Sequence, residues 1–371
     1  DNMHYTGSGG TGEGNMKAFK TGPPSNRRQY LAVSVANNAG STRDSLLLDV
    51  THKSAQLRLV QVIPFYRPSV SIPFTIDGAL YLLLGTVHTP APPWLPVYKL
   101  ILDDNDAACD TFATTCGNNE RTNELPNFGV TAEQVHFTIG DRHFVAIGYQ
   151  RNLNGRTLQL PIYEFNRTKQ VTELSADHLK GRELYGDFDL FQLLPSYSVS
   201  SVVTATIGME VFLFVGQKQS VDHLAVHRIH QTQVFRYCSV ENKFLPHQKL
   251  LEERMNIPGP QLTTFADGED HFLVEASYEK VVACVLYKFN HVTLLWSHHQ
   301  TISSTDQGFQ KVVAFDINGD AYLVGIHTRS SYNSLVYKRN RVSGDFEVSS
   351  VLEKRCELGT QANVLGEGWR I

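Results

Sequence analysis

One pattern recurs along this 371-residue chain and limits its possible folds more than any other feature. A short apolar run leads into a turn that contains glycine, and a second apolar run with an aromatic or aliphatic start follows. Neighbouring turn glycines of the five clearest copies lie 51 to 68 residues apart. Such internal repetition is the signature of folds that stack one small structural unit many times. The turn glycines are Gly78, Gly140, Gly208, Gly268 and Gly319.

Each copy continues with two more strand-like runs. The third run places a charged residue after an aromatic one, as in Leu286-Tyr287-Lys288. The fourth carries an apolar residue, three spacers, Gln, one spacer and an aliphatic residue, as in Trp296…Gln300-x-Ile302. Four short strands per unit, repeated around a ring, predict an all-β chain that forms a single β-propeller. Because no segment has a sustained helical period, we expect less than about a tenth of the chain in helix.

The copies set the expected domain boundaries. Residues 1–29 are rich in Gly, Ser and Asn and are predicted to be a flexible leader, with the propeller over residues 30–371. Six copies are present, so six blades are preferred and seven are the alternative. The run 361–365 can supply an inner strand before Tyr30, which would close the ring with strands from both termini. The second copy lacks a clear fourth strand, and residues 103–133 are predicted to replace it with a polar insertion.

Charge and hydropathy exclude two classes of protein. The formal net charge is −4, with charges spread along the chain, and this argues against a nucleic-acid binder. The longest apolar run, 79–84, is far shorter than the roughly 18 residues that a membrane-spanning helix needs. The sequence therefore predicts a protein with no nucleic-acid partner and no membrane span.

Three features favour a secreted, extracellular glycoprotein. The chain starts at Asp1 rather than Met, as a mature chain would after removal of a signal segment. Cys109 and Cys116 are close together in a polar stretch, and this spacing predicts a disulfide between them. Asn166-Arg167-Thr168 is a sequon for glycosylation of Asn166. The pairing of the three other cysteines stays open: Cys238, Cys284 and Cys356.

Two acidic segments are candidate Ca²⁺ sites, although no cofactor is required by the pattern. Alternation in Asp316-Ile317-Asn318-Gly319-Asp320 places the side-chain oxygens of Asp316, Asn318 and Asp320 on one side. The alternative is an ordinary Asn-Gly hairpin turn, which we favour. Asp103 and Asn105 belong to an acidic run that is either a second Ca²⁺ site or a solvated loop. The spacing of His223 and His227 would suit Zn²⁺ on a helix, but the surrounding β-rich stretch argues against it.

The repeated strings resemble a known family. A Phe-Thr-Ile-x-Gly turn, a Val/Ile-Tyr-Lys strand and a Phe/Trp-x-x-x-Gln-x-Ile strand are similar to the epilepsy-associated repeat, also called the EPTP repeat. That repeat occurs in leucine-rich glioma-inactivated proteins and in thrombospondin-type laminin G domain proteins. The resemblance covers roughly residues 30–352. It implies a β-propeller for extracellular protein recognition, with no catalytic residue to carry over.

No Gly-x-Ser-x-Gly elbow or phosphate-binding loop is present, so the sequence favours a protein that is not an enzyme. We expect a secreted recognition module that binds an extracellular protein or a glycan with one face of the propeller. The alternative is a small-molecule protein, either an enzyme or a pigment or cofactor carrier, that uses the central channel or a pocket between loops. Long segments between strands should gather aromatic, His and Arg residues at one mouth of the channel. These candidate ligand-binding residues are Trp94, Tyr149, Arg151, Arg156, His223, His227 and Arg228.

Overall fold

The computed structural model describes sixteen segments of the chain, and all of its secondary structure there is β-strand. The segments are residues 4–7, 14–21, 28–35, 45–49, 58–63, 68–86, 94–101, 118–152, 159–166, 187–217, 231–250, 260–276, 284–302, 308–309, 311–326 and 333–352. No helix in these segments is long and apolar enough to cross a membrane.

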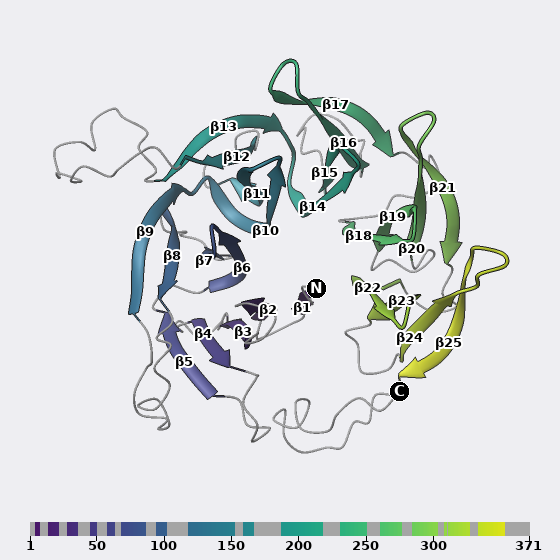
Figure 1. Ribbon diagram of the computed structural model, residues 1–371, viewed down its shortest axis with the longest axis horizontal. Coiled ribbons are helices and arrows are strands. Elements are labelled where there is room, and N and C mark those ends of the chain that lie inside the picture. Colours follow the sequence, from purple (N-terminus) through teal and green to yellow (C-terminus); the bar gives the residue numbers. More distant parts are fainter. Residues whose placement is uncertain are drawn as a thin grey trace.

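The strands form six antiparallel sheets, which we call blades 1 to 6, and Figure 1 shows them following one another around a common centre. Blade 1 has five strands, and each of the others has four that pair in chain order. Blade 1 contains β1 (His4–Gly7), β2 (Gly14–Thr21), β3 (Arg28–Val35), β4 (Ser45–Asp49) and β5 (Arg58–Ile63). Blade 2 contains β6 (Pro68–Ile76), β7 (Ala79–Thr86), β8 (Trp94–Ile101) and β9 (Asn118–Pro126). Blade 3 contains β10 (Gly129–Ile139), β11 (Arg142–Asn152), β12 (Gln159–Phe165) and β13 (Phe188–Pro195).

The remaining blades repeat the four-stranded order. Blade 4 contains β14 (Val199–Ile207), β15 (Glu210–Gln217), β16 (Gln231–Cys238) and β17 (Lys243–Leu250). Blade 5 contains β18 (Gln261–Asp267), β19 (Asp270–Ala276), β20 (Cys284–Asn290) and β21 (Leu295–Ile302). Blade 6 contains β22 (Lys311–Ile317), β23 (Asp320–Ile326), β24 (Ser334–Arg339) and β25 (Phe346–Leu352). The first strand of each four-stranded blade lies nearest the centre and the fourth lies at the periphery (Figure 1).

The turn glycines fix the register of the first hairpin in each blade. In blade 6, Asn318 and Gly319 have φ values of 55° and 85° and connect Ile317 to Asp320. Positive φ at both central residues is typical of a two-residue hairpin turn that suits the twist of the strands. The alternative that the sequence analysis favoured for this segment, an Asn-Gly hairpin, therefore describes its backbone.

The third and fourth strands share a second regular feature. Their register shifts by one residue at the same place in blades 2 to 6, for example between Val234 and Phe235 and between Leu286 and Tyr287. The extra residue of each bulge immediately precedes the position of the repeated Gln. Bulges bend a strand and increase its local twist, so this one shapes the outer edge of each of these blades in the same way.

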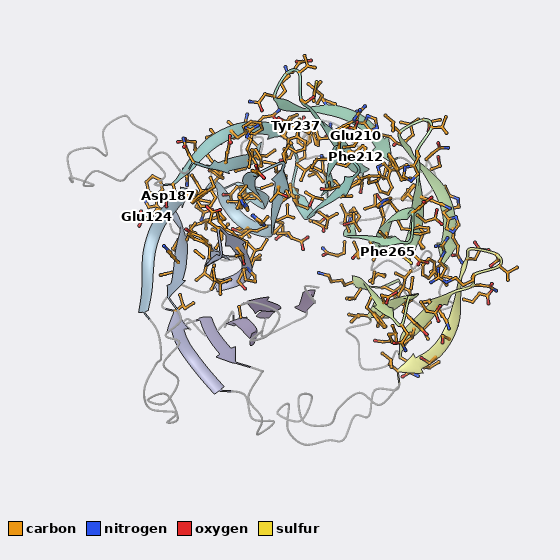
Figure 2. The ribbon with its side chains drawn as sticks, in the orientation of Figure 1. Glu124, Asp187, Glu210, Phe212, Tyr237 and Phe265 are labelled. Atoms are coloured by element: carbon orange, nitrogen blue, oxygen red, sulfur yellow. The ribbon has the colours of Figure 1, made fainter. Side chains whose placement is uncertain are left out.

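Apolar side chains fill the spaces between successive blades (Figure 2). Phe144, Phe212 and Phe272 hold equivalent places on the second strands and are fully buried. The equivalent Tyr322 in blade 6 is only partly buried, and so is Val324 on the same face. The described inner strands contact one another in order from β2 to β22, and no packing of that extent joins β22 back to β2.

The prediction of an all-β propeller is confirmed, and two details differ from the sequence analysis. The prediction that residues 103–133 replace the fourth strand of the second copy is wrong, because β9 lies within this range and pairs with β8. Its sequence, Asn-Asn-Glu-Arg-Thr-Asn-Glu-Leu-Pro, has too few apolar residues to show the strand pattern. The strand before β3 is β2, which comes from the expected leader, while residues 361–365 lie outside the described segments.

Candidate functional site at the inner strands

The described residues do not assemble the predicted ligand-binding face. Tyr149 lies in the core between blades 2 and 3, where its hydroxyl donates a hydrogen bond to the Pro126 carbonyl oxygen at 3.1 Å. Burial raises the pKa of this phenol. Trp94 is partly buried and packs against the same core, and Arg151 is in β11, where only its backbone is described. The others lie outside the described segments: Arg156, His223, His227 and Arg228.

The acidic residues of the blade 6 hairpin are engaged by the protein itself. Asp316 Oδ1 accepts a hydrogen bond from the Gly319 amide at 2.9 Å. Asp320 Oδ2 lies 2.7 Å from Lys338 Nζ. Within the part of the chain that the structure describes, no group of three or more His, Cys, Asp or Glu side chains is placed to hold a metal ion. Asp103 and Asn105 lie outside that part.

The predicted modification sites are only partly described. Cys109 and Cys116 lie outside the described segments, whereas Cys238 and Cys284 are free thiols. Burial raises the pKa of the Cys284 thiol, which makes it a poor nucleophile. Asn166 is half-buried at the end of β12, and its Nδ2 donates to Asp189 Oδ2 at 2.8 Å.

Alignment of the blades by their first hairpins reveals polar residues that the sequence patterns did not single out. The inner strands of blades 2 to 6 end at equivalent residues next to the turn. Six residues earlier, each inner strand has one residue at the same level of the propeller. We call this set the inner level; it consists of Val70, Glu133, Ser201, Gln261 and Lys311.

Hydrogen bonds connect this level across three successive blades. Ser201 Oγ donates to Glu133 Oε2 at 2.5 Å, and the Val202 amide donates to the same oxygen at 3.2 Å. On its other side, Ser201 Oγ accepts the Leu262 amide of blade 5 at 3.1 Å. A short O–H···O distance is typical of a hydroxyl that donates to a charged carboxylate. The polar chain therefore runs from blade 5 through blade 4 to the carboxylate of blade 3.

The two oxygens of Glu133 have different surroundings. Both described hydrogen bonds reach Oε2, and no hydrogen bond to Oε1 occurs among the described residues. Ser201 is fully buried, whereas the Glu133 side chain is partly exposed. Oε1 is therefore the oxygen of Glu133 that has no hydrogen bond to the described residues.

Lys311 contributes an amine at the same level. Its side chain is 6% exposed on the inner strand of blade 6. Burial lowers the pKa of its amine, and the negative charge of Glu133 partly opposes that effect. The two groups thus interact electrostatically although their blades are separated by two others. Together they offer one carboxylate and one amine on inner strands that face the same centre (Figure 1).

No protein-family model matches this chain, and no curated protein is a significant match. Solved structures do resemble its fold. The periplasmic gluconolactonase PpgL of Pseudomonas aeruginosa has a TM-score of 0.57 and 12% identity, with 93% of each chain covered. The structure of YjhT has a TM-score of 0.49 and 10% identity, covering 90% of this chain and 97% of that one. A putative 6-phosphogluconolactonase of Bacteroides fragilis has a TM-score of 0.44 and 11% identity, covering 90% and 98%. At these identities the similarity establishes the fold alone.

These findings correct three expectations from the sequence. The assignment to the epilepsy-associated repeat family is wrong, because no family model matches and the chain is similar in fold to a gluconolactonase. The expected secreted recognition module is contradicted by the same similarity, which fits the alternative, a small-molecule protein that uses the central channel or a pocket between loops, better. The expectation of a non-enzyme is corrected on the same ground. The repeated strings misled because they follow from blade packing, which unrelated propellers share.

The sequence contains one signal for the inner level, which is the spacing of its residues from the repeated hairpin. Glu133 and Lys311 lie at the same distance before the ends of their inner strands, which the repeated hairpin marks. Each residue by itself is an ordinary charged residue in a β-rich stretch. Only the comparison of blades in register places them together.

Proposed function

We propose that this protein is a hydrolase that opens small cyclic esters of sugar acids at its inner level. The observation that carries the proposal is the pairing of a partly exposed carboxylate, Glu133, with a buried amine, Lys311, on inner strands of one propeller. The fold similarity to a gluconolactonase supports the choice of substrate class.

In the proposed reaction, Glu133 Oε1 is the general base. It removes a proton from a water molecule while the water oxygen adds to the ester carbonyl carbon. The bond between that carbon and the ring oxygen then breaks, and the ring oxygen takes up the proton to give the open hydroxy acid. Lys311 Nζ donates a hydrogen bond to the negative oxygen that develops during the addition. The overall step consumes one lactone and one water.

The test is a pH-stat assay of the purified full chain with glucono-δ-lactone, corrected for spontaneous opening. We expect the wild-type protein to accelerate acid release. Glu133→Gln should lower kcat by about 100-fold or more, because loss of a general base typically costs 10²–10⁴-fold. Lys311→Met should also lower kcat. The matched control is Glu210→Gln, which removes another partly exposed carboxylate that pairs with Arg236 away from the inner level.

Two outcomes would refute the proposal. One is a wild-type protein that does not accelerate opening of glucono-δ-lactone or of its phosphorylated analogue. The other is a Glu133→Gln variant as active as Glu210→Gln. A difference between the two lactones would show which of them the site accepts.

We further propose that the protein is exported, with a Cys109–Cys116 disulfide and a glycan on Asn166. The sequon and the spacing of the two cysteines support this proposal. The similarity to a periplasmic protein agrees with it. Peptide mapping of the natural protein without reduction tests both modifications. Free thiols at both cysteines together with an unmodified Asn166 would contradict export.

A further inference from the structure

The surroundings of Ser201 restrict the hydrogen bonds that its hydroxyl can make. The side chain is fully buried, so bulk water does not compete for it. A serine hydroxyl has one proton to donate and two lone pairs to accept with. The Leu262 amide occupies one lone pair at 3.1 Å, and the proton is directed to Glu133 Oε2 at 2.5 Å. The backbone of blade 5 thereby sets the direction of the hydroxyl.

This arrangement selects one of the two orientations that a glutamate carboxylate can adopt. The terminal torsion of the side chain is broad and roughly two-fold, so its two oxygens can exchange places. Ser201 and the Val202 amide both bind Oε2, which leaves Oε1 without a hydrogen bond to the described residues. A general base reacts faster when one of its oxygens is held toward the reacting water. A displacement of about 1 Å from that position can lower the rate by about 100-fold.

We propose that Ser201 is a positioning residue that fixes Glu133 with Oε1 toward the reacting water. The inference rests on the proposed function for its catalytic consequence, but the orientation of the carboxylate is a property of the folded protein alone. Ser201 acts through Glu133 and does not touch the substrate.

The neighbouring serine provides a matched control. Ser200 lies on the same strand, and its single hydroxyl proton is shared between the carbonyl oxygens of Pro260 and Gly216, which lie 2.8 Å and 3.1 Å from its Oγ. It thus links blade 4 to blade 5 as Ser201 does, but it has no described contact with Glu133. Removal of either hydroxyl disturbs blade packing, whereas only Ser201→Ala removes a hydrogen bond to the carboxylate.

The experiment compares Ser201→Ala, Ser201→Cys, Ser201→Thr and Ser200→Ala with the wild-type full chain. Infrared difference spectra against Glu133→Gln isolate the carboxylate stretching bands of Glu133 in each background. We expect these bands to shift in Ser201→Ala and in Ser201→Cys, whose thiol is a weak donor. They should keep the wild-type position in Ser200→Ala and return toward it in Ser201→Thr, which restores a hydroxyl.

Kinetics with glucono-δ-lactone provide the second measurement. Ser201→Ala should lower kcat by about 10- to 100-fold with little change in KM, because the substrate itself does not contact this hydroxyl. Ser200→Ala should leave both values close to wild type. If the wild-type protein opens no lactone, the proposed function fails while the infrared comparison still decides the orientation of Glu133.

The inference is overturned if the carboxylate bands of Ser201→Ala match those of the wild type. It is also overturned if Ser200→Ala shifts them equally, since the effect would then come from blade packing. If Ser201→Ala does not fold, Ser201→Cys is nearly the same size as the original side chain and decides the question by the same bands.

Discussion

Gln248 of blade 4 binds both backbone groups of Trp296 in blade 5. Its Nε2 donates to the Trp296 carbonyl oxygen at 2.8 Å, and the Trp296 amide donates to its Oε1 at 2.9 Å. Gln192 forms the same pair of bonds with Phe244, and Gln300 forms it with Phe346. The Gln that recurs in the fourth strands is therefore a link between the outer edges of adjacent blades, and the recurring aromatic residue marks the backbone that receives it.

We predict that Gln248→Leu lowers the free energy of unfolding by about 1–3 kcal/mol, because two hydrogen bonds are lost and two backbone groups lose their partner. Chemical denaturation followed by intrinsic fluorescence measures this. The control is Lys249→Ala at the exposed neighbouring position, which should change stability by less than about 0.5 kcal/mol. Equal effects of the two variants would show that the link contributes nothing.

The cross-strand ion pairs of blades 3 and 4 place their charges in opposite order. Arg142 and Glu164 pair in blade 3, and Glu210 and Arg236 pair at the equivalent positions of blade 4. We predict that Glu210→Arg and Arg236→Glu each cost up to about 1 kcal/mol, because like charges then face each other at a partly exposed site. The double variant should recover most of that loss, since it reproduces the polarity of blade 3. A double-mutant cycle checks the recovery, and strictly additive losses would contradict it.

Equivalent aromatic residues should differ in their contribution to stability. Phe272→Ala removes a fully buried ring and should cost about 3–5 kcal/mol. Tyr322→Ala at the same position of blade 6 should cost roughly half as much, because part of the ring is already exposed. Denaturation midpoints with their slopes test the difference. Equal losses would mean that blade 6 is covered in solution as completely as blade 5.

His136 makes stability depend on pH. Its Nε2 lies 3.1 Å from His143 Nδ1, and its ring stacks on Phe74 at 4.9 Å. Burial, and then the charge of His143, lower the pKa of His136 to about 4 from its ordinary value of 6.5. The unfolded chain therefore takes up this proton first as pH falls. The contribution of a neutral His136 is complete above pH 6.5 and is lost progressively down to about pH 4, amounting to roughly 3 kcal/mol.

We predict that His136→Phe flattens the loss of stability between pH 6.5 and pH 4. Denaturation curves for the wild type and the variant, measured at several pH values, give the difference directly. The exposed His298, whose Nε2 lies 2.8 Å from Thr301 Oγ1, provides a control as His298→Gln. An unchanged pH slope in His136→Phe would contradict the assignment.

The sequence by itself determined the class of fold and the unit of repetition. Alternating apolar residues, turn glycines and the recurring Gln were enough, because a four-stranded unit buries both faces only by stacking on copies of itself. It did not reveal β9, whose polar residues lack the alternation on which strand prediction depends. It also pointed to the wrong family, since the repeated strings serve blade packing, as the link from Gln248 to Trp296 shows.

The tertiary structure alone decided the candidate site. Glu133, Ser201 and Lys311 are far apart in the chain and share no local motif, and the common register of the inner strands brings them to one level. Tyr149 shows the reverse case, since its place beside a long segment between strands suggested a binding face, whereas packing put it in the core. Local patterns are set by the period of a strand, but contacts between blades depend on ring geometry, and the linear sequence does not state that geometry.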